Sequence, residues 1–289
     1  MSLIGILLAL LAARLASEVP WLGQPRLIER LMRDPQRLVP LPSYWRSAAA
    51  PALLLVLVSA LVAAASRLLS HPVLSLIFNA SVLFLCLGPR DIGQDIEQLI
   101  AARESGDAES ERKLTRQLLI GPERRQSRHS LLGALFIQSH ENLFGVLLWF
   151  IALGPFGAVL YRLGSRMPRF LHESQPGTDA ERSAMFLHAA LAWIPARLCA
   201  ALYGLAGSLD QAMAQWRKLM GHRAGNWRDR TWRLLSEVSA AALTVEEEAG
   251  EVMPARFEDC LREVLAMRQR ALLILLAAYG IFTAGGVIT

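Results

Sequence analysis

Long runs of apolar residues are the feature that most constrains this chain. Residues 47–66 are almost entirely Ala, Leu and Val, and a second apolar run, residues 72–88, follows after a short link. About 20 consecutive apolar residues form a helix that crosses the hydrocarbon core of a bilayer. A helix is suited to that environment because it satisfies all its backbone polar groups internally. The runs therefore predict an all-α fold: a polytopic helical membrane protein with amphipathic cytoplasmic helices.

The composition agrees with a membrane environment and argues against nucleic acid as a partner. Charged residues make up 19% of the chain and hydrophobic residues 53%, whereas a soluble domain carries about 25% charge. The net charge is +5, but most of the arginines lie in the loops between the apolar runs, where they are the usual orientation signal of a membrane protein. We therefore expect the lipid bilayer, and no nucleic acid, as a partner.

The apolar runs also divide the chain into alternating membrane and polar segments. Residues 2–16 are interpreted as a short first span rather than a cleaved signal peptide, because no basic residue precedes them and no clean small-x-small site follows. The total number of spans is left open between four and six. The predicted segments are membrane hairpins at 1–88 (spans at about 2–16, 47–66 and 72–88), a cytoplasmic helical segment at 89–142, interrupted membrane helices at 143–208, a second cytoplasmic helical segment at 209–270, and a C-terminal span at 271–289.

Two of the apolar runs contain helix breakers. The run 143–163 has Gly154-Pro155-Phe156-Gly157 at its centre, so it either spans with a kink or turns back as a re-entrant hairpin. We favour the hairpin. The run 184–208 is interrupted by Pro195-Ala196-Arg197. An arginine within an apolar run is costly in lipid, so we expect Arg197 to face protein or water, near Glu141 or another acid.

The distribution of basic residues predicts the orientation. Loops 14–46, 89–142 and 209–270 hold six, eight and ten Lys and Arg residues, whereas the link 67–71 holds one. The positive-inside rule therefore places these three loops in the cytoplasm of a bacterium, and the protein in its inner membrane as a multi-pass chain. The arginines of segment 164–183 obey this rule only if the run 143–163 is re-entrant, because a re-entrant run returns the chain to the cytoplasmic side.

The segment 89–142 carries apolar stripes at helical spacing. Ile92, Ile96, Leu99 and Ile100 lie on one face of a helix, and Gly106 ends it. Such a stripe either packs within the protein or docks a partner, and we favour packing.

One polar group stands directly before the interrupted run 143–163. It consists of His140, Glu141 and Asn142, and a hairpin would return Tyr161 and Arg162 to the same level. A straight helix would instead separate Glu141 and Arg162 by about 30 Å. The alternative is a solvated helix turn at the membrane surface. The candidate ligand-binding residues are Glu141, Asn142, Tyr161, Arg162, Arg197 and His140.

Motifs for soluble enzyme chemistry are missing. The sequence contains no GxGxxG, GxxxxGK[ST], HExxH or GxSxG motif, and its histidines and three cysteines lack metal-ligand spacing. We therefore predict no catalytic residues, no metal site and no cofactor; a nucleotide has no supporting motif.

Three stretches resemble a known family. They are Glu141 to Phe150, Leu153 to Ala158 and Leu160 to Leu163, and they resemble AmpE, a family of Gram-negative inner-membrane proteins linked to β-lactamase induction. AmpE belongs with the CobD/CbiB membrane proteins of cobalamin biosynthesis, which Gln24 to Leu31 and Trp193 to Leu198 resemble. The resemblance implies a sensor or modulator in peptidoglycan-recycling signalling, with an AmpD-like amidase or a muropeptide as a partner.

The departures from the cobalamin enzymes favour the AmpE branch. Those enzymes have an Asp-Gly pair shortly after Glu-Asn, whereas Leu143 to Val146 contains no carboxylate. They continue after Tyr-Arg with Asn-Thr-Leu-Asp, whereas this chain reads Leu163-Gly164-Ser165-Arg166. A non-enzymatic sensor is therefore favoured, and the alternative is a membrane amide-bond-forming enzyme related to CobD/CbiB.

Overall fold

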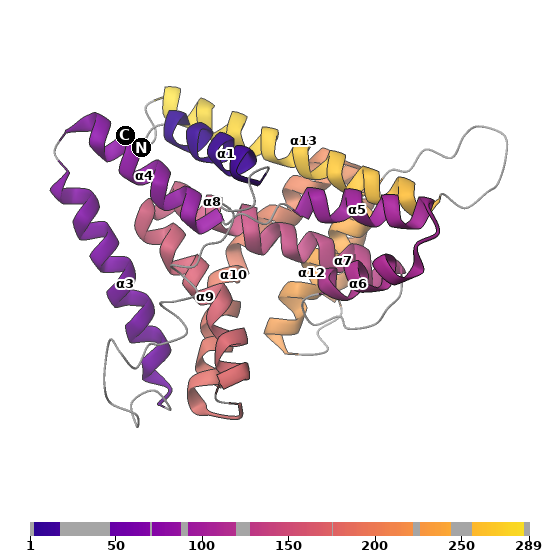
Figure 1. Ribbon diagram of the computed structural model, residues 1–289, viewed down its shortest axis with the longest axis horizontal. Helices are drawn as coiled ribbons and strands as arrows, with labels where there is room; N and C mark the ends of the chain where they lie inside the picture. Colours follow the sequence, from indigo (N-terminus) through magenta and orange to yellow (C-terminus); the bar gives the residue numbers. More distant parts are fainter. Residues whose placement is uncertain are drawn as a thin grey trace. The chain divides into compact units, whose positions relative to one another are not determined.

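The computed structural model describes residues 3–17, 47–69, 71–87, 92–119, 128–174, 176–221, 226–243 and 256–285. All regular elements within these ranges are helices (Figure 1), which confirms the all-α class. In chain order they are α1 (Leu3–Ser17), α3 (Ala49–Leu68), α4 (Pro72–Leu87), α5 (Ile92–Glu104), α6 (Ala108–Leu118), α7 (Arg128–Ser139), the π-helical turn η3 (His140–Phe144), α8 (Gly145–Leu153), α9 (Pro155–Ser174), α10 (Asp179–Ala206), α11 (Leu209–Gly221), α12 (Trp227–Ala241) and α13 (Phe257–Ala284).

The chain divides into two compact units, which are described separately. The first unit contains residues 1–90 and 141–195, and the second contains residues 91–140 and 196–288. In the first unit α9 packs against α3, α4 and α8, and α1 packs against α4. Its apolar core joins side chains of three helices, Leu55 of α3, Leu163 of α9 and Ala184 of α10 among them.

Large apolar side chains point outward from the long helices. On α3, Leu53, Leu57 and Leu61 are 54%, 55% and 61% exposed, which suits a surface covered by lipid rather than water. Five stretches among the described residues are long and apolar enough to cross a membrane, and α1 is a shorter apolar helix. The chain is therefore a multi-pass membrane protein. The five stretches are Ala49–Leu68, Pro72–Glu104 (which includes residues 88–91, outside the described part of the chain), Leu131–Leu153, Asp179–Ala206 and Phe257–Ala284.

The apolar run 143–163 turns back on itself at Gly154. This glycine has a φ of +69°, a conformation that side chains with a Cβ avoid, and α9 starts directly after it at Pro155. Proline suits this first helical position because its missing N–H would have had no helical partner. α8 and α9 pack together so closely that a Cβ on Gly157 would overlap with the backbone carbonyl of Trp149. The helix therefore breaks at Gly154 and its two parts pack on each other; that this hairpin is re-entrant in the membrane stays a prediction.

The expected interruption at Pro195 is not a break. α10 runs without a break from Asp179 to Ala206, with Pro195 inside it, so the prediction of an interrupted helix was wrong at this position. A proline removes one backbone hydrogen bond, and a long helix can retain its course through that loss when it is supported by its neighbours. The predicted C-terminal span is the second half of the 28-residue helix α13. Most of the loop 14–46 lies outside the described residues.

In the second unit, the apolar stripe of α5 is buried. Ile92, Ile96 and Leu99 are each at most 1% exposed, and α5 packs against α6, α7 and α13. The prediction that this stripe packs within the protein is confirmed. Gly106 ends α5 with a φ of +72°, and the Asp107 carboxylate then caps α6 by accepting bonds from the backbone N–H groups of the next turn. A hydrogen bond with the Ser110 side chain, followed by those from the backbone N–H groups of Ser110 and Glu109, lowers the pKa of Asp107.

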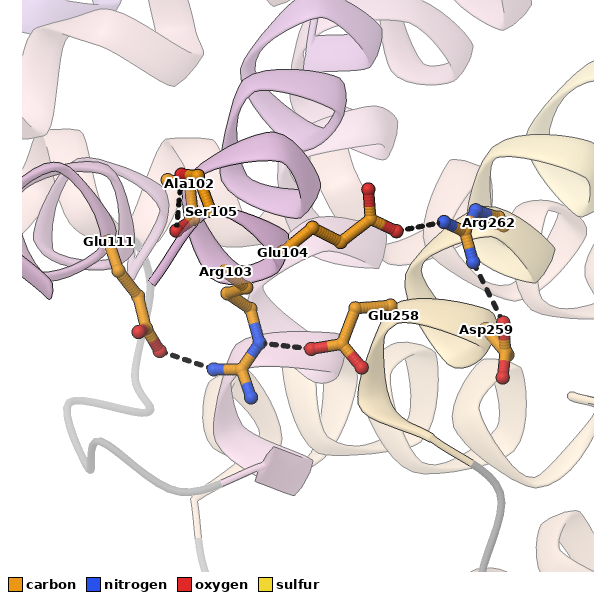
Figure 2. Close-up of polar contacts among 8 residues, drawn as sticks. All are labelled: Ala102, Arg103, Glu104, Ser105, Glu111, Glu258, Asp259 and Arg262. Carbon is orange, nitrogen blue, oxygen red and sulfur yellow. Dashed lines mark hydrogen bonds and ion pairs between the residues drawn. The ribbon is translucent and has the colours of Figure 1, made fainter. Parts of the chain in front are cut away.

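Ion pairs connect α5, α6 and α13 within the second unit (Figure 2). The guanidinium of Arg103 binds Glu111 of α6 and, over 2.6 Å, Glu258 of α13. Next to it, Arg262 of α13 binds Glu104 of α5 and Asp259 of its own helix. We call these six residues the interhelical ion-pair group. Two arginines face four carboxylates, so each cation has more than one acidic partner.

Candidate functional site

Two guanidinium groups converge on one side-chain amide in the first unit. Arg162 and Arg166 are separated by one turn of α9, so both side chains leave the same face of that helix. The Nη1 of Arg162 donates to the Oδ1 of Asn142 over 3.1 Å, and the Nη2 of Arg166 donates to the same oxygen over 2.9 Å. A neutral oxygen thus holds two like charges close together. Arg162, Arg166, Asn142, Glu141 and His188 are called the arginine cluster below.

Arg162 is buried at the end of α4. Its side chain is 5% exposed, and its Nη2 donates to the backbone carbonyl of Leu87 over 3.3 Å. A carbonyl at the C-terminus of a helix has no partner within that helix and carries partial negative charge, so a guanidinium there satisfies it and is favoured electrostatically. The position of Arg162 is thereby fixed by two neutral acceptors from two different segments.

Glu141 supplies the acid of the cluster, and α10 supplies a histidine beside it. The Oε1 of Glu141 lies 3.5 Å from the Nε2 of His188. Both side chains are mostly buried, at 19% and 12% exposure. The arginines Arg162, Arg166 and Arg169 all act electrostatically on the Glu141 carboxylate. The surroundings of Glu141 are therefore rich in positive charge, which favours anionic groups.

Tyr161 forms the apolar wall of this site. It is fully buried, its ring meets the His188 ring edge-on with centroids 6.4 Å apart, and α8 approaches it through Gly145. A Cβ on Gly145 would overlap with the Tyr161 ring, so glycine is required there. The Nε1 of Trp149 donates to the carbonyl of Leu191 over 3.0 Å and ties α8 to α10. The cluster is thus held by helices that are packed on one another.

The structure brings together four of the six predicted site residues. Glu141, Asn142, Tyr161 and Arg162 all contribute to the cluster in the first unit, as the hairpin path requires. His140 and Arg197 belong to the second unit. There His140 is fully buried with its ring edge-on to that of Trp232, at 6.1 Å between centroids.

Arg197 is partly buried in the second unit. Another cation, Arg230, acts electrostatically on it there. The expectation that Arg197 lies near Glu141 concerns residues of different units and stays a prediction.

Sequence reasoning missed Arg166 and His188. The spacing of Arg166, four residues after Arg162, was a usable signal, because it places the two guanidiniums on one face of a helix. His188 gave no such signal, since it reaches the site from a helix far along the sequence. Among the described residues, no group of three or more His, Cys, Asp and Glu side chains is arranged to hold a metal ion.

Long apolar helices around a buried, positively charged cluster define a multi-pass helical membrane protein with a polar site inside its helices. Residues 1–283 match the family described as regulatory signalling modulator protein AmpE. The chain belongs to this AmpE family. It is also similar to the cobalamin biosynthesis protein CobD of Chromobacterium violaceum, with 30% identity over 271 residues, which cover 86% of this chain and 76% of that protein. No solved structure matches the chain.

Proposed function

We propose that the protein is an inner-membrane sensor or modulator in β-lactamase induction and peptidoglycan-recycling signalling, and that the arginine cluster binds its anionic ligand. The observation that carries this proposal is the convergence of Arg162 and Arg166 on the neutral oxygen of Asn142. Membership of the AmpE family supports the signalling role.

The chemistry of the cluster suits a carboxylate ligand. A guanidinium presents paired N–H donors whose spacing matches a carboxylate, and such charge-assisted bonds are about twice as strong as neutral ones. Arg166 is partly exposed, whereas Arg162 is buried, so Arg166 is the residue that can reach an incoming group. Muropeptides carry several carboxylates, and we propose them as the ligand class, with an AmpD-like amidase as the partner that trims them.

The test is ligand binding by the full chain reconstituted in lipid nanodiscs. Calorimetry with an anhydromuropeptide should detect binding to the unsubstituted chain, and Arg166→Gln should weaken it at least about tenfold, because a hydrogen bond to a charged group contributes about 1.5–3 kcal/mol. Arg182→Gln is the matched control, since Arg182 is an exposed arginine paired with Asp179. Equal affinity in the two variants would exclude the cluster as the site, and no binding by the unsubstituted chain would exclude the ligand class.

The second candidate is a membrane amide-bond-forming enzyme related to CobD/CbiB. Its support is the 30% identity to a protein named for cobalamin biosynthesis. The segment Leu143 to Val146 lacks the carboxylate of those enzymes, so we expect the purified chain to form no amide bond on a cobalamin precursor. Turnover of that precursor would reverse the choice.

The orientation is part of the same proposal. We place residues 14–46, 89–142 and 209–270 in the cytoplasm because these segments carry most of the basic residues. Ser110→Cys in intact cells should then resist a membrane-impermeant thiol reagent and react after the membrane is permeabilised. Reaction in intact cells would contradict this orientation.

A further inference from the structure

An apolar strip is exposed on α11, a helix of the second unit that is not among the candidate spans. Leu209, Met213 and Met220 are 46%, 42% and 62% exposed. Their spacing of four and seven residues places them on one face of the helix, with Trp216 between them. This face is called the α11 apolar strip.

The strip is not the face that α11 uses for packing in its own unit. That face carries Ala212, which is 2% exposed, and Gln215, whose Nε2 donates to Glu237 of α12 over 2.7 Å. At 100° per residue, Ala212 and Gln215 lie about 60–120° from the position of Leu209 around the helix axis. Packing on α12 therefore fixes the rotation of α11 and leaves the strip turned away from that contact.

The chain reverses direction sharply where α10 passes into α11. A Cβ on Gly204, in the last turn of α10, would lie 3.1 Å from the Cβ of Ala212. In one continuous helix, positions eight residues apart are separated by about 12 Å along the axis. α11 therefore folds back beside the end of an apolar helix whose own Leu198 and Leu205 are 47% and 56% exposed.

A basic residue borders the strip. Arg217 lies about 80° around the axis from Leu209, and its Nε donates to the carbonyl of Met213 over 3.3 Å. This bond holds the exposed guanidinium beside the apolar strip. An exposed arginine beside an exposed apolar face fits a helix that lies in the plane of a membrane interface; on the same side Asp210, about 100° from Leu209, adds one acidic residue.

We propose that α11 lies in the membrane interface, with the α11 apolar strip in the acyl region and Arg217 on the phosphate of an anionic lipid. Two observations carry the proposal: the exposed apolar residues continue from the lipid-facing helix α10 onto α11, and the basic border complements an anionic headgroup. Lipid covers the strip without any protein partner, because the bilayer already surrounds α10.

The test is the depth of single positions in the full chain reconstituted in vesicles. An environment-sensitive fluorophore is attached to Met213→Cys, Met220→Cys or Gln211→Cys. Its fluorescence at positions 213 and 220 should be quenched by nitroxide-labelled lipids. Quenching by aqueous iodide should be severalfold weaker at these two positions than at position 211. Gln211 is the control because it is exposed on the opposite side of α11. The native cysteines of the described chain are buried, so the unsubstituted protein gives the background labelling.

Each outcome decides the proposal. Equal iodide quenching at positions 211, 213 and 220 would overturn it, and protection from both quenchers would overturn it in favour of a protein covering the strip. Replacing part of the phosphatidylcholine by phosphatidylglycerol should increase lipid quenching at position 220, and Arg217→Gln should abolish that increase. An equal increase in the Arg217→Gln protein would refute the role given to Arg217.

Discussion

Arg162 in the first unit and Arg103 in the second unit each bind two partners, but the partners are of different kinds. Arg103 binds two carboxylates, Glu111 and Glu258, and its side chain is 31% exposed. Arg162 binds the amide oxygen of Asn142 and the carbonyl of Leu87, both neutral, and is 5% exposed. Arg162, the more deeply buried of the two, therefore has neutral hydrogen-bond acceptors, whereas Arg103 has charged ones.

This difference separates a structural role from a binding role. A partly exposed arginine between two acids connects helices at little cost, because water still solvates its charge. A buried cation beside further cations is costly, and such groups concentrate at functional sites. The interhelical ion-pair group is accordingly explained by packing alone, whereas the burial of like charges in the arginine cluster is the basis of the anionic ligand that we propose for it.

The largest effect should come from opening the hairpin on which the arginine cluster depends. Gly157→Ala introduces a Cβ against the backbone carbonyl of Trp149, which cannot move without separating α8 from α9. We expect a loss of about 3 kcal/mol or more in the free energy of unfolding, measured by denaturant titration in detergent. Gly106→Ala is the matched control, with open space around its Cβ but a φ of +72°, and should cost about 1–2 kcal/mol. Equal losses would contradict the tight hairpin.

A smaller effect is expected when the buried cation is removed. Arg162→Gln is too short to reach both of its acceptors, and leaving the Leu87 carbonyl without its partner should cost about 1–2 kcal/mol of stability. This loss should be the same at low salt and at about 1 M salt, because mobile ions do not screen a buried contact effectively. A loss that disappears in high salt would show that Arg162 is solvated, and the contrast with Arg103 would fail.

The smallest effect is expected in the interhelical ion-pair group. Arg103→Gln should reduce stability by less than about 1 kcal/mol at low salt and by less still at high salt, because its partners are solvated. A double-mutant cycle with Glu258→Gln isolates the pair. A coupling that exceeds the cost of Arg162→Gln would reverse the ranking of the two groups.

The long apolar runs and the hairpin could be predicted from the sequence because they depend on local chemistry. Twenty apolar residues satisfy their backbone in lipid as a helix, and a Gly-Pro pair such as Gly154-Pro155 favours a kink or a break in it. Arg162 then returns to the level of Asn142 because the segments before and after Gly154-Pro155 have equal length.

Features that depend on packing between distant segments could not be predicted in this way. The pairing of His188 with Glu141 requires the position of α10, which no local pattern encodes. The two prolines, by contrast, differ in a local signal: Pro195 lies inside a continuous helix, whereas Pro155 starts a new one. The difference is the preceding residue: Gly154 adopts a positive φ without strain, whereas Ile194 continues the helix.

The π-helical turn His140–Phe144 has a geometric consequence for the helix that contains it. Such a turn holds one residue more than an α-helical turn, so everything after it is rotated by about 100°. His140 is assigned to one unit and Glu141 to the other, so the rotation falls where the helix changes its packing environment. The residues before and after the turn therefore follow two different hydrophobic registers. Deleting a single residue in this turn would remove the rotation, so that one register would continue through the helix and Gly145 would move away from the Tyr161 ring.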